Sequence, residues 1–259
     1  MLVVGLTGGI ASGKSTVSKQ LQAHGVPLID LDVLARVAVE PDSYALSALV
    51  SHFGQQILQP DGRSLNREKL GSIVFGNEKE RKVLNSIVHP AVRRLLVWEL
   101  VKAWLRGEKV CVVDAPLLIE AGLWKMCGAI LVVYCSEILQ LQRLRSRNDL
   151  SLSDAQARLA SQLPLHTKLK YADYVIDNSG PISDLSAQVD RVVERLHRRA
   201  GWSWIISWVV PPVGIIRAAL RVGWRLWIQR VGKEKGRSTR GERKPEEIEL
   251  RDRKSNRSS

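Results

Sequence analysis

The chain has 259 residues, of which 45% are hydrophobic and 25% are charged, a normal balance for one substantial globular domain with appendages. The formal net charge of +13 is unevenly distributed, because residues 1–199 contribute +5 and residues 200–259 contribute +8. This distribution indicates a mildly basic domain followed by a basic tail, and it argues against a nucleic-acid-binding domain.

The first element of the chain is a strand at 2–7, "LVVGLT", followed by a helix at 14–25 that ends at Gly25. Between them lies the pattern G-x-x-x-x-G-K-[ST], formed by Gly8, Gly9, Ile10, Ala11, Ser12, Gly13, Lys14 and Ser15. Glycines allow backbone N–H groups to surround a phosphate, and the start of the helix adds partial positive charge. Lys14 is placed to bridge the β- and γ-phosphates, and the Ser15 hydroxyl is the expected Mg²⁺ ligand. The sequence therefore predicts a nucleoside triphosphate site.

The second strand, at 26–30, ends in "IDLDVLAR", residues 29–36. Ligands bind at the carboxyl ends of parallel strands, so this element lies beside the phosphate loop. Asp30 and Asp32 point to the same side if the chain is extended here. One of them then accepts the proton of an attacking hydroxyl. The alternative is that an Asp after a strand caps the next helix.

Residues 31–109 are too long for a single connection and predict an inserted helical region over the sheet. Its last helix is expected to have Pro90 at the first helical position and to end before Gly107. A third strand at 110–114 ends in Asp114, which is the usual position of a carboxylate that holds Mg²⁺ directly or through water. A turn-forming Asp before Pro116 is the competing interpretation.

The remaining strands are expected at 129–134 and 173–177, with helical segments between them. Arg143 and Arg147 are four residues apart and share one helical face, and Arg158 lies on a helix that begins near Ser151. Such arginines either close over the phosphates as a lid or form a solvated basic face. Alternating strands and helices predict an α/β fold with a parallel five-stranded sheet flanked by helices.

No guanine-reading N-K-x-D element is present in the sequence, and the chain is short for a motor, so a small-molecule kinase is favoured. Over residues 2–190 the chain resembles the dephospho-CoA kinase family. The resemblance is carried by six ordered elements: "GLTGGIASGKS", "IDLDVLAR", "LNREKLGSIVF", "IVHPAVR", "DAPLLIEAGL" and "RLASQLPLHTKLKYADYVIDNSG". Ala11, Leu31 and Asn66 stand where the family usually has Gly, Ala and Asp.

The resemblance implies a P-loop nucleoside-monophosphate-kinase-like fold with a helical substrate-binding insertion at about 31–109 and a lid at about 143–170. It implies that ATP phosphorylates the ribose 3′-hydroxyl of dephospho-CoA to give coenzyme A and ADP, with Mg²⁺. Asp32 is the implied catalytic carboxylate, with Lys14 and Arg147 as further catalytic residues. The implied ATP-binding residues are 8–15 with Thr16, Arg143 and Arg158. The implied substrate-side residues are Asp32, Arg36, His89 and Glu120. The implied metal ligands are Ser15 and Asp114. His89 before Pro90 has helix capping as its alternative role.

The expected kinase domain ends at residue 199, and a different composition follows. Five of the eight tryptophans lie between 202 and 227, and residues 200–216 carry no charge. Arg217, Arg221 and Arg225 then recur at a spacing of four. Tryptophan with arginine favours a helix at a bilayer surface, so we expect 200–231 to associate with a membrane surface; a helix packed on the kinase domain and a segment that crosses the bilayer are the alternatives. Residues 232–259 are polar and are expected to form a disordered basic tail.

No signal peptide is recognisable before the phosphate loop, so the expected location is intracellular and cytosol-facing, with peripheral attachment to an organelle membrane. Two rival functions stay open on the residues alone. One is a kinase for another nucleoside or nucleotide, which a panel of acceptors separates. The other is a non-catalytic nucleotide-binding protein that recruits partners to a membrane.

Overall fold

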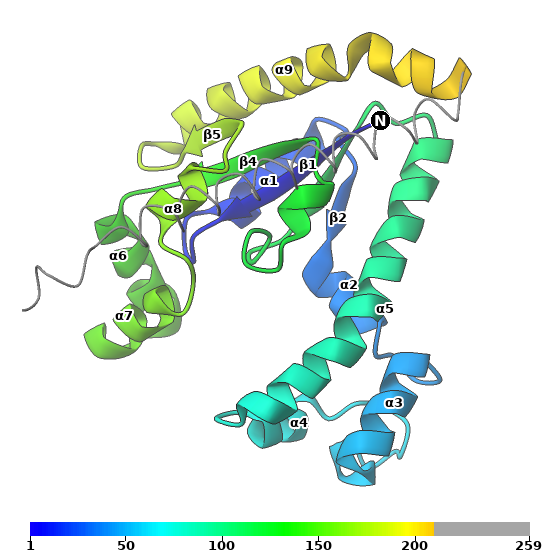
Figure 1. Cartoon of the computed structure of the whole chain (residues 1–259). Coiled ribbons are helices and arrows are strands. Elements are labelled where there is room, and N and C mark those ends of the chain that lie inside the picture. The colour runs from blue at the N-terminus through cyan, green and yellow to red at the C-terminus, as the bar shows by residue number, and fades with distance from the viewer. Residues whose placement is uncertain (210–259) are drawn as a thin grey trace, which may run out of the picture. The chain divides into compact units, whose positions relative to one another are not determined.

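A computed structural model of the chain describes residues 1–209. Its centre is one parallel sheet of five strands in the order β2-β3-β1-β4-β5 (Figure 1). The strands are β1 (Leu2–Gly8), β2 (Leu28–Asp30), β3 (Val110–Asp114), β4 (Ala129–Tyr134) and β5 (Tyr174–Asp177). The predicted α/β fold and the approximate position of every predicted strand are confirmed.

Helices cover both faces of this sheet, which explains why its strands are apolar runs without alternation. All five residues of β3 are buried. One face packs against α1 (Lys14–Ala23) and α9 (Ile182–Val209). The other packs against α2 (Leu31–Val37), α5 (Glu78–Leu105) and α8 (Leu165–Leu169).

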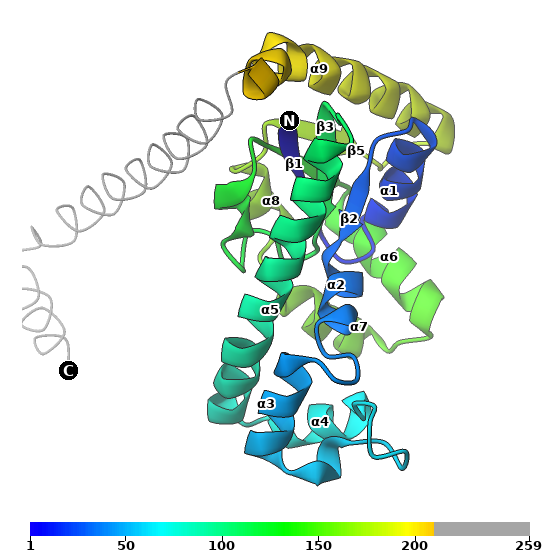
Figure 2. The ribbon, with the colours of Figure 1, turned by 90° about the vertical axis from the view of Figure 1, so that its right-hand side faces the viewer.

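A second group of helices extends away from the sheet along α5 (Figure 2). It consists of α3 (Tyr44–Phe53), the 3₁₀ turn η1 (Gln55–Ile57) and α4 (Arg67–Val74). These helices have a hydrophobic cluster of their own, centred on the fully buried Leu49 and Ile57. Two further helices follow β4, α6 (Glu137–Asn148) and α7 (Leu152–Ala160), and they contact each other. The 3₁₀ turn η2 (Leu123–Met126) precedes β4.

The prediction that Pro90 begins a helix is wrong. Helix α5 starts at Glu78, capped by the Asn77 side chain, which accepts hydrogen bonds from the N–H groups of Lys79 and Glu80. Pro90 therefore lies in the helix interior, where it removes one helical hydrogen bond. Pro90 and Ser86, four residues earlier, are both exposed, so water can satisfy the carbonyl that Pro90 leaves without its usual donor.

Helix α9 continues beyond residue 199, where the domain boundary was placed from composition. The helix bends at Gly201 and runs to Val209. Its Ala200 side chain belongs to the hydrophobic core and is 1% exposed. The remaining parts of the predicted membrane segment and basic tail, 210–231 and 232–259, lie outside the described residues. Within 1–209, no helix combines the length and the apolar character that a bilayer crossing requires.

Candidate active site

The phosphate loop connects β1 to α1 with the geometry its glycines predict. Gly13, just before α1, has φ +88°, and a Cβ there would lie 1.9 Å from the Asn178 side-chain nitrogen. That nitrogen donates to the Ser12 carbonyl at 2.9 Å, so the loop and the chain after β5 meet closely. Ala11 also has a positive φ of 58°, which glycine adopts without strain.

Two pockets, one of about 450 Å³ and one of about 390 Å³, lie at the carboxyl ends of β1 and β3. The smaller one, called here the phosphate pocket, is formed by the loop and three other segments. It is lined by Gly8, Gly9, Ile10, Ala11, Ser12, Gly13, Lys14, Ser15, Pro116, Arg143, Arg147 and Gln162. Twelve residues were predicted to bind ATP or to act on its phosphates, and ten of them line the phosphate pocket. Thr16 and Arg158 do not line it.

The three arginines of the predicted lid differ in their surroundings. Arg143 on α6 donates from Nη2 to the Asn178 carbonyl at 3.0 Å, and its buried Nη1 has no partner among the described residues. Arg147, one turn later, is exposed and also faces the phosphate pocket. Arg158 on α7 is exposed and lines neither of the two pockets. Positive charge therefore faces the phosphate pocket from α6.

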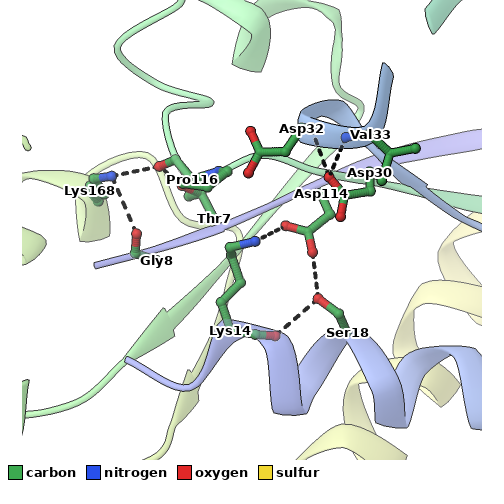
Figure 3. Close-up of polar contacts among 10 residues, drawn as sticks. All are labelled: Thr7, Gly8, Lys14, Ser18, Asp30, Asp32, Val33, Asp114, Pro116 and Lys168. Atoms are coloured by element: carbon green, nitrogen blue, oxygen red, sulfur yellow. Dashed lines mark hydrogen bonds and ion pairs between the residues drawn. The ribbon is translucent and has the colours of Figure 1, made fainter. Parts of the chain in front are cut away.

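Lys14 and Asp114 form an ion pair across the carboxyl ends of β1 and β3 (Figure 3). Asp114 is 4% exposed, and its other oxygen accepts a hydrogen bond of 2.6 Å from Ser18. The Lys14 carbonyl lies 3.0 Å from the same hydroxyl and shares its single proton with Asp114, the closer acceptor. The Asp114 carboxylate is therefore a satisfied buried anion that holds the Lys14 ammonium beside the phosphate pocket.

Asp30 and Asp32 have separate roles, because the chain is not extended between them. Asp30 ends β2 and caps α2, its carboxylate accepting from the N–H groups of Asp32 at 2.8 Å and Val33 at 3.3 Å. The capping interpretation thus holds for Asp30. Asp32 lies in the first helical turn with its carboxylate extended over the space between Pro116 and Asp114 (Figure 3).

The environment of Asp32 raises the pKa of its carboxyl above the ordinary value. The main cause is partial removal of water by the surrounding protein, followed by the negative charge of Asp30. Lys14 and Arg36 act in the opposite direction, and Asp114 adds to the increase. A carboxylate whose proton affinity is increased in a pocket is a candidate general base.

The larger pocket begins at Asp32 and extends between α2, α5 and the chain that follows β3; it is called here the acceptor pocket. Most of its lining is apolar, including Leu49, Val92 and Leu96. Its polar and charged side chains are Asp32, Arg67, Asn85, His89, Arg93 and Gln162. Pro116 and Gln162 line both pockets, so the two spaces share a wall. The arrangement suits two substrates that meet near Asp32.

Of the predicted substrate-side residues, Asp32 and His89 line the acceptor pocket, whereas Arg36 and Glu120 do not. His89 lies in the middle of α5, which excludes the capping alternative. Sequence reasoning did not single out Arg67 and Arg93, although both lie inside the elements "LNREKLGSIVF" and "IVHPAVR". Arg93 follows His89 by four residues, which places both on one face of a helix and could have signalled it; Arg67 has no predicted substrate-side residue near it in the sequence.

Lys168 on α8 is a third residue that the sequence did not reveal, and its side chain is 0% exposed. Its ammonium donates to the Pro116 carbonyl at 2.8 Å and to the Gly8 carbonyl at 3.4 Å (Figure 3). It also pairs with Glu120 at 2.9 Å. A buried ammonium requires such partners. Lys168 thus joins the phosphate loop to the shared wall of the two pockets, and Glu120 neutralises its charge.

We expect Lys168→Met to lower the free energy of unfolding by about 2–3 kcal/mol, because buried carbonyls lose their donor while the packing of the stem is largely kept. The measurement is urea unfolding at neutral pH. Lys170→Met is the matched control, since Lys170 is exposed and surface substitutions change stability by about 0.5 kcal/mol or less. Equal losses in the two variants would show that the Lys168 contacts contribute nothing.

The sequence and the fold are similar to those of known proteins. The family model described as dephospho-CoA kinase matches residues 2–184. A dephospho-CoA kinase of Halalkalibacterium halodurans is 46% identical over 75% of this chain and 96% of its own. One of Saccharomyces cerevisiae is 39% identical over 91% of this chain and 98% of its own. The solved structure of a dephospho-CoA kinase from Campylobacter jejuni superimposes with a TM-score of 0.61 at 29% identity, covering 76% of this chain and 97% of that one.

Proposed function

The chain belongs to the dephospho-CoA kinase family, and from this premise we propose how its residues carry out the reaction. The reaction is the ATP-dependent phosphorylation of the ribose 3′-hydroxyl of dephospho-CoA, which gives coenzyme A and ADP as the last step of coenzyme A biosynthesis. The observation that supports the residue assignment is the shared wall of the two pockets, with Asp32 on the acceptor side and Lys14 on the phosphate side.

Asp32 acts on the acceptor hydroxyl. Its carboxylate accepts the hydroxyl proton as the oxygen approaches the γ-phosphate, or orients that hydroxyl for in-line attack. The raised pKa makes it a stronger proton acceptor than an ordinary aspartate. Asp30 contributes indirectly, because it caps α2 and its charge raises the proton affinity of Asp32.

The phosphate loop, residues 8–15 with Thr16, holds the phosphates of ATP through its backbone N–H groups. Lys14 leaves Asp114 and pairs with the β- and γ-phosphates when the nucleotide binds. Arg143 and Arg147 add positive charge from α6, and the segment 143–170, which includes Arg158, closes as a lid over the transferred group. The unpartnered Nη1 of Arg143 supports this role, since it is a buried donor without an acceptor among residues 1–209.

Mg²⁺ is the proposed metal. Within residues 1–209, no three or more His, Cys, Asp or Glu side chains form a cluster that could hold a metal. Mg²⁺ does not need such a cluster, because it is usually held by substrate phosphates and one or two protein oxygens. The Ser15 hydroxyl lines the phosphate pocket, and Asp114 is a buried carboxylate next to it, so these two oxygen donors fit. When bound, the ion neutralises charge on the phosphates.

The helical region 31–109 supplies the acceptor side. The apolar wall of its pocket suits the pantetheine arm of dephospho-CoA, and Arg67 and Arg93 suit its diphosphate. His89 lines the same pocket, which supports a contact with the same substrate. Arg36 acts mainly through its charge next to Asp32, and Glu120 acts through Lys168.

The assignment is tested by measuring ADP release with ATP and one acceptor at a time. Dephospho-CoA is expected to stimulate release strongly, with coenzyme A as the product. Coenzyme A is the matched control, because its 3′-hydroxyl is already phosphorylated and it must not stimulate release. Equal or greater stimulation by adenosine or a nucleoside monophosphate would instead indicate another acceptor.

The residues that follow the kinase region are proposed to bind the cytosol-facing surface of an organelle membrane. Support comes from the sequence of 200–231, which combines tryptophans with Arg217, Arg221 and Arg225. Each cation near an anionic leaflet contributes about 1 kcal/mol. The full chain with all three arginines changed to Gln is therefore expected to bind vesicles containing phosphatidylserine about 100-fold more weakly.

Sedimentation with vesicles measures this binding, and the matched control changes Arg251, Arg253 and Lys254 to Gln in the basic tail. The control removes the same charge outside the proposed membrane segment. If both triple variants lose the same affinity, or the native chain does not bind vesicles, the membrane assignment is wrong.

A further inference from the structure

Gln162 has an unusual position at the boundary between the two pockets. It lies in the turn between α7 and α8, and it lines both the acceptor pocket and the phosphate pocket. Pro116 is the other residue common to both linings. The Pro116 carbonyl already accepts hydrogen bonds from Thr7 at 3.0 Å and Lys168 at 2.8 Å. Gln162 therefore provides the side-chain hydrogen-bonding capacity at this boundary.

The carboxamide oxygen of Gln162 is buried and has no hydrogen-bond partner among residues 1–209. Buried polar atoms in folded proteins are almost always paired, so an orphaned one next to a substrate pocket points to a group that arrives with the substrate. A carboxamide offers one accepting oxygen and two N–H donors. It matches a hydroxyl on one side and a phosphoryl oxygen on the other.

The turn that carries Gln162 is held in place by a chain of polar contacts. The next residue, Leu163, donates its N–H to Glu120 at 3.2 Å, and Glu120 pairs with the buried Lys168. Lys168 in turn binds the carbonyls of Pro116 and Gly8. The backbone at Gln162 is thus anchored to the shared wall and to the phosphate loop, which limits the positions its side chain can adopt.

A ribose acceptor presents two neighbouring hydroxyls, and the proposed mechanism gives Asp32 only the attacking one. We propose that Gln162 is a positioning residue for the ribose, whose carboxamide oxygen accepts a hydrogen bond from the hydroxyl next to the attacking one. Its amino group donates to the transferred phosphoryl group. The inference rests on the proposed function of Asp32, and it assigns a second, separate contact to the same acceptor.

The experiment compares dephospho-CoA with its 2′-deoxyribose analogue, using the native chain, Gln162→Met and Gln162→Glu. Removing the neighbouring hydroxyl leaves the Gln162 oxygen unpaired, so the native chain is expected to lose about tenfold in kcat/KM on the analogue. Gln162→Met has a similar size and cannot accept or donate, so it is expected to be about 10- to 100-fold slower on dephospho-CoA. It should then show less than about a twofold difference between the two acceptors.

Gln162→Glu separates the two contacts, because a carboxylate still accepts from the hydroxyl but repels the phosphoryl group. It should keep the discrimination between the acceptors and lose kcat. Gln22→Met is the matched control on α1: Gln22 is exposed, lies outside the acceptor pocket, the phosphate pocket and the segment 143–170, and should leave both kcat and discrimination unchanged. The melting temperature of each variant reports on folding.

Three results would overturn the proposal. The first is a native chain that uses both acceptors equally well, which is decided without any variant. The second is Gln162→Met with native discrimination, and the third is Gln162→Met with native activity. Failure of the proposed function looks different, since the native chain would then transfer no phosphate to dephospho-CoA at all.

Discussion

Asp32→Asn is expected to lower kcat for phosphate transfer to dephospho-CoA by about 10²- to 10⁴-fold, the range of a general base. Asparagine keeps the shape of the side chain, but its amide does not accept the proton of an attacking hydroxyl. The affinity for ATP should change little, because Asp32 lines the acceptor pocket and not the phosphate pocket. Coupled ADP release gives kcat, and titration calorimetry gives the dissociation constant of ATP.

The same substitution has an expected effect on stability. The folded-state pKa of Asp32 is raised, so its ionised form costs stability at pH values above the folded pKa, and that cost disappears as the pH falls below the unfolded value. Asp32→Asn removes the charge and should melt at neutral pH no lower than the native chain. A variant that is inactive and also clearly less stable would indicate a structural role for Asp32 and contradict the catalytic one.

Asp30→Asn is the matched control, since it makes the same chemical change two residues away. The side-chain oxygen of the substituted asparagine can still cap α2, so the helix should stay in place. Asp30 raises the pKa of Asp32 through its charge. Its removal lowers that pKa, and the acidic limb of the kcat profile should therefore move to lower pH while the plateau activity is largely kept.

Lys14→Met is expected to reduce kcat/KM for ATP by about 10³-fold or more, because the variant loses the cation that faces the β- and γ-phosphates. It should also be less stable by about 3 kcal/mol, since the buried Asp114 carboxylate loses its charged partner and keeps the Ser18 hydroxyl. Steady-state kinetics and urea unfolding measure the two effects.

The effect of Lys14 on ATP turnover can be separated from its effect on stability by changing the other residues that contact Asp114. Ser18→Ala removes one partner of Asp114 without touching the phosphate pocket, so it should lose stability and keep most of the ATP affinity. The double variant Lys14→Met/Asp114→Asn relieves the unpaired charge and should recover stability without recovering activity. Recovery of activity in the double variant would mean that Lys14 acts only by neutralising Asp114.

The strands and the phosphate loop were predictable because their signals are contiguous in the sequence. β3 and β4 are continuous apolar runs, which a sheet covered on both faces requires. The loop combines a fixed spacing of glycines with Lys14 and Ser15. Each of these features is decided by neighbouring residues, so reading the sequence alone recovers them.

Lys168 was not predictable for the opposite reason. In sequence it is an ordinary lysine in a short helix, and its burial depends on carbonyls 52 and 160 residues away. The Asp30 and Asp32 pair was partly misread, because the extended chain assumed between them is the first turn of α2. Pro90 misled for a related reason: a preference for the first helical turn does not exclude a helix whose cap lies upstream at Asn77.

The most direct test of the account is a crystal structure of Asp32→Asn with dephospho-CoA and a non-hydrolysable ATP analogue. The predicted result is the side chain of residue 32 within about 2.6–3.2 Å of the ribose 3′-hydroxyl, with that oxygen directly facing the γ-phosphate beside Pro116 and Gln162. A ribose bound elsewhere in the acceptor pocket, with residue 32 turned to solvent while both substrates are present, would contradict it.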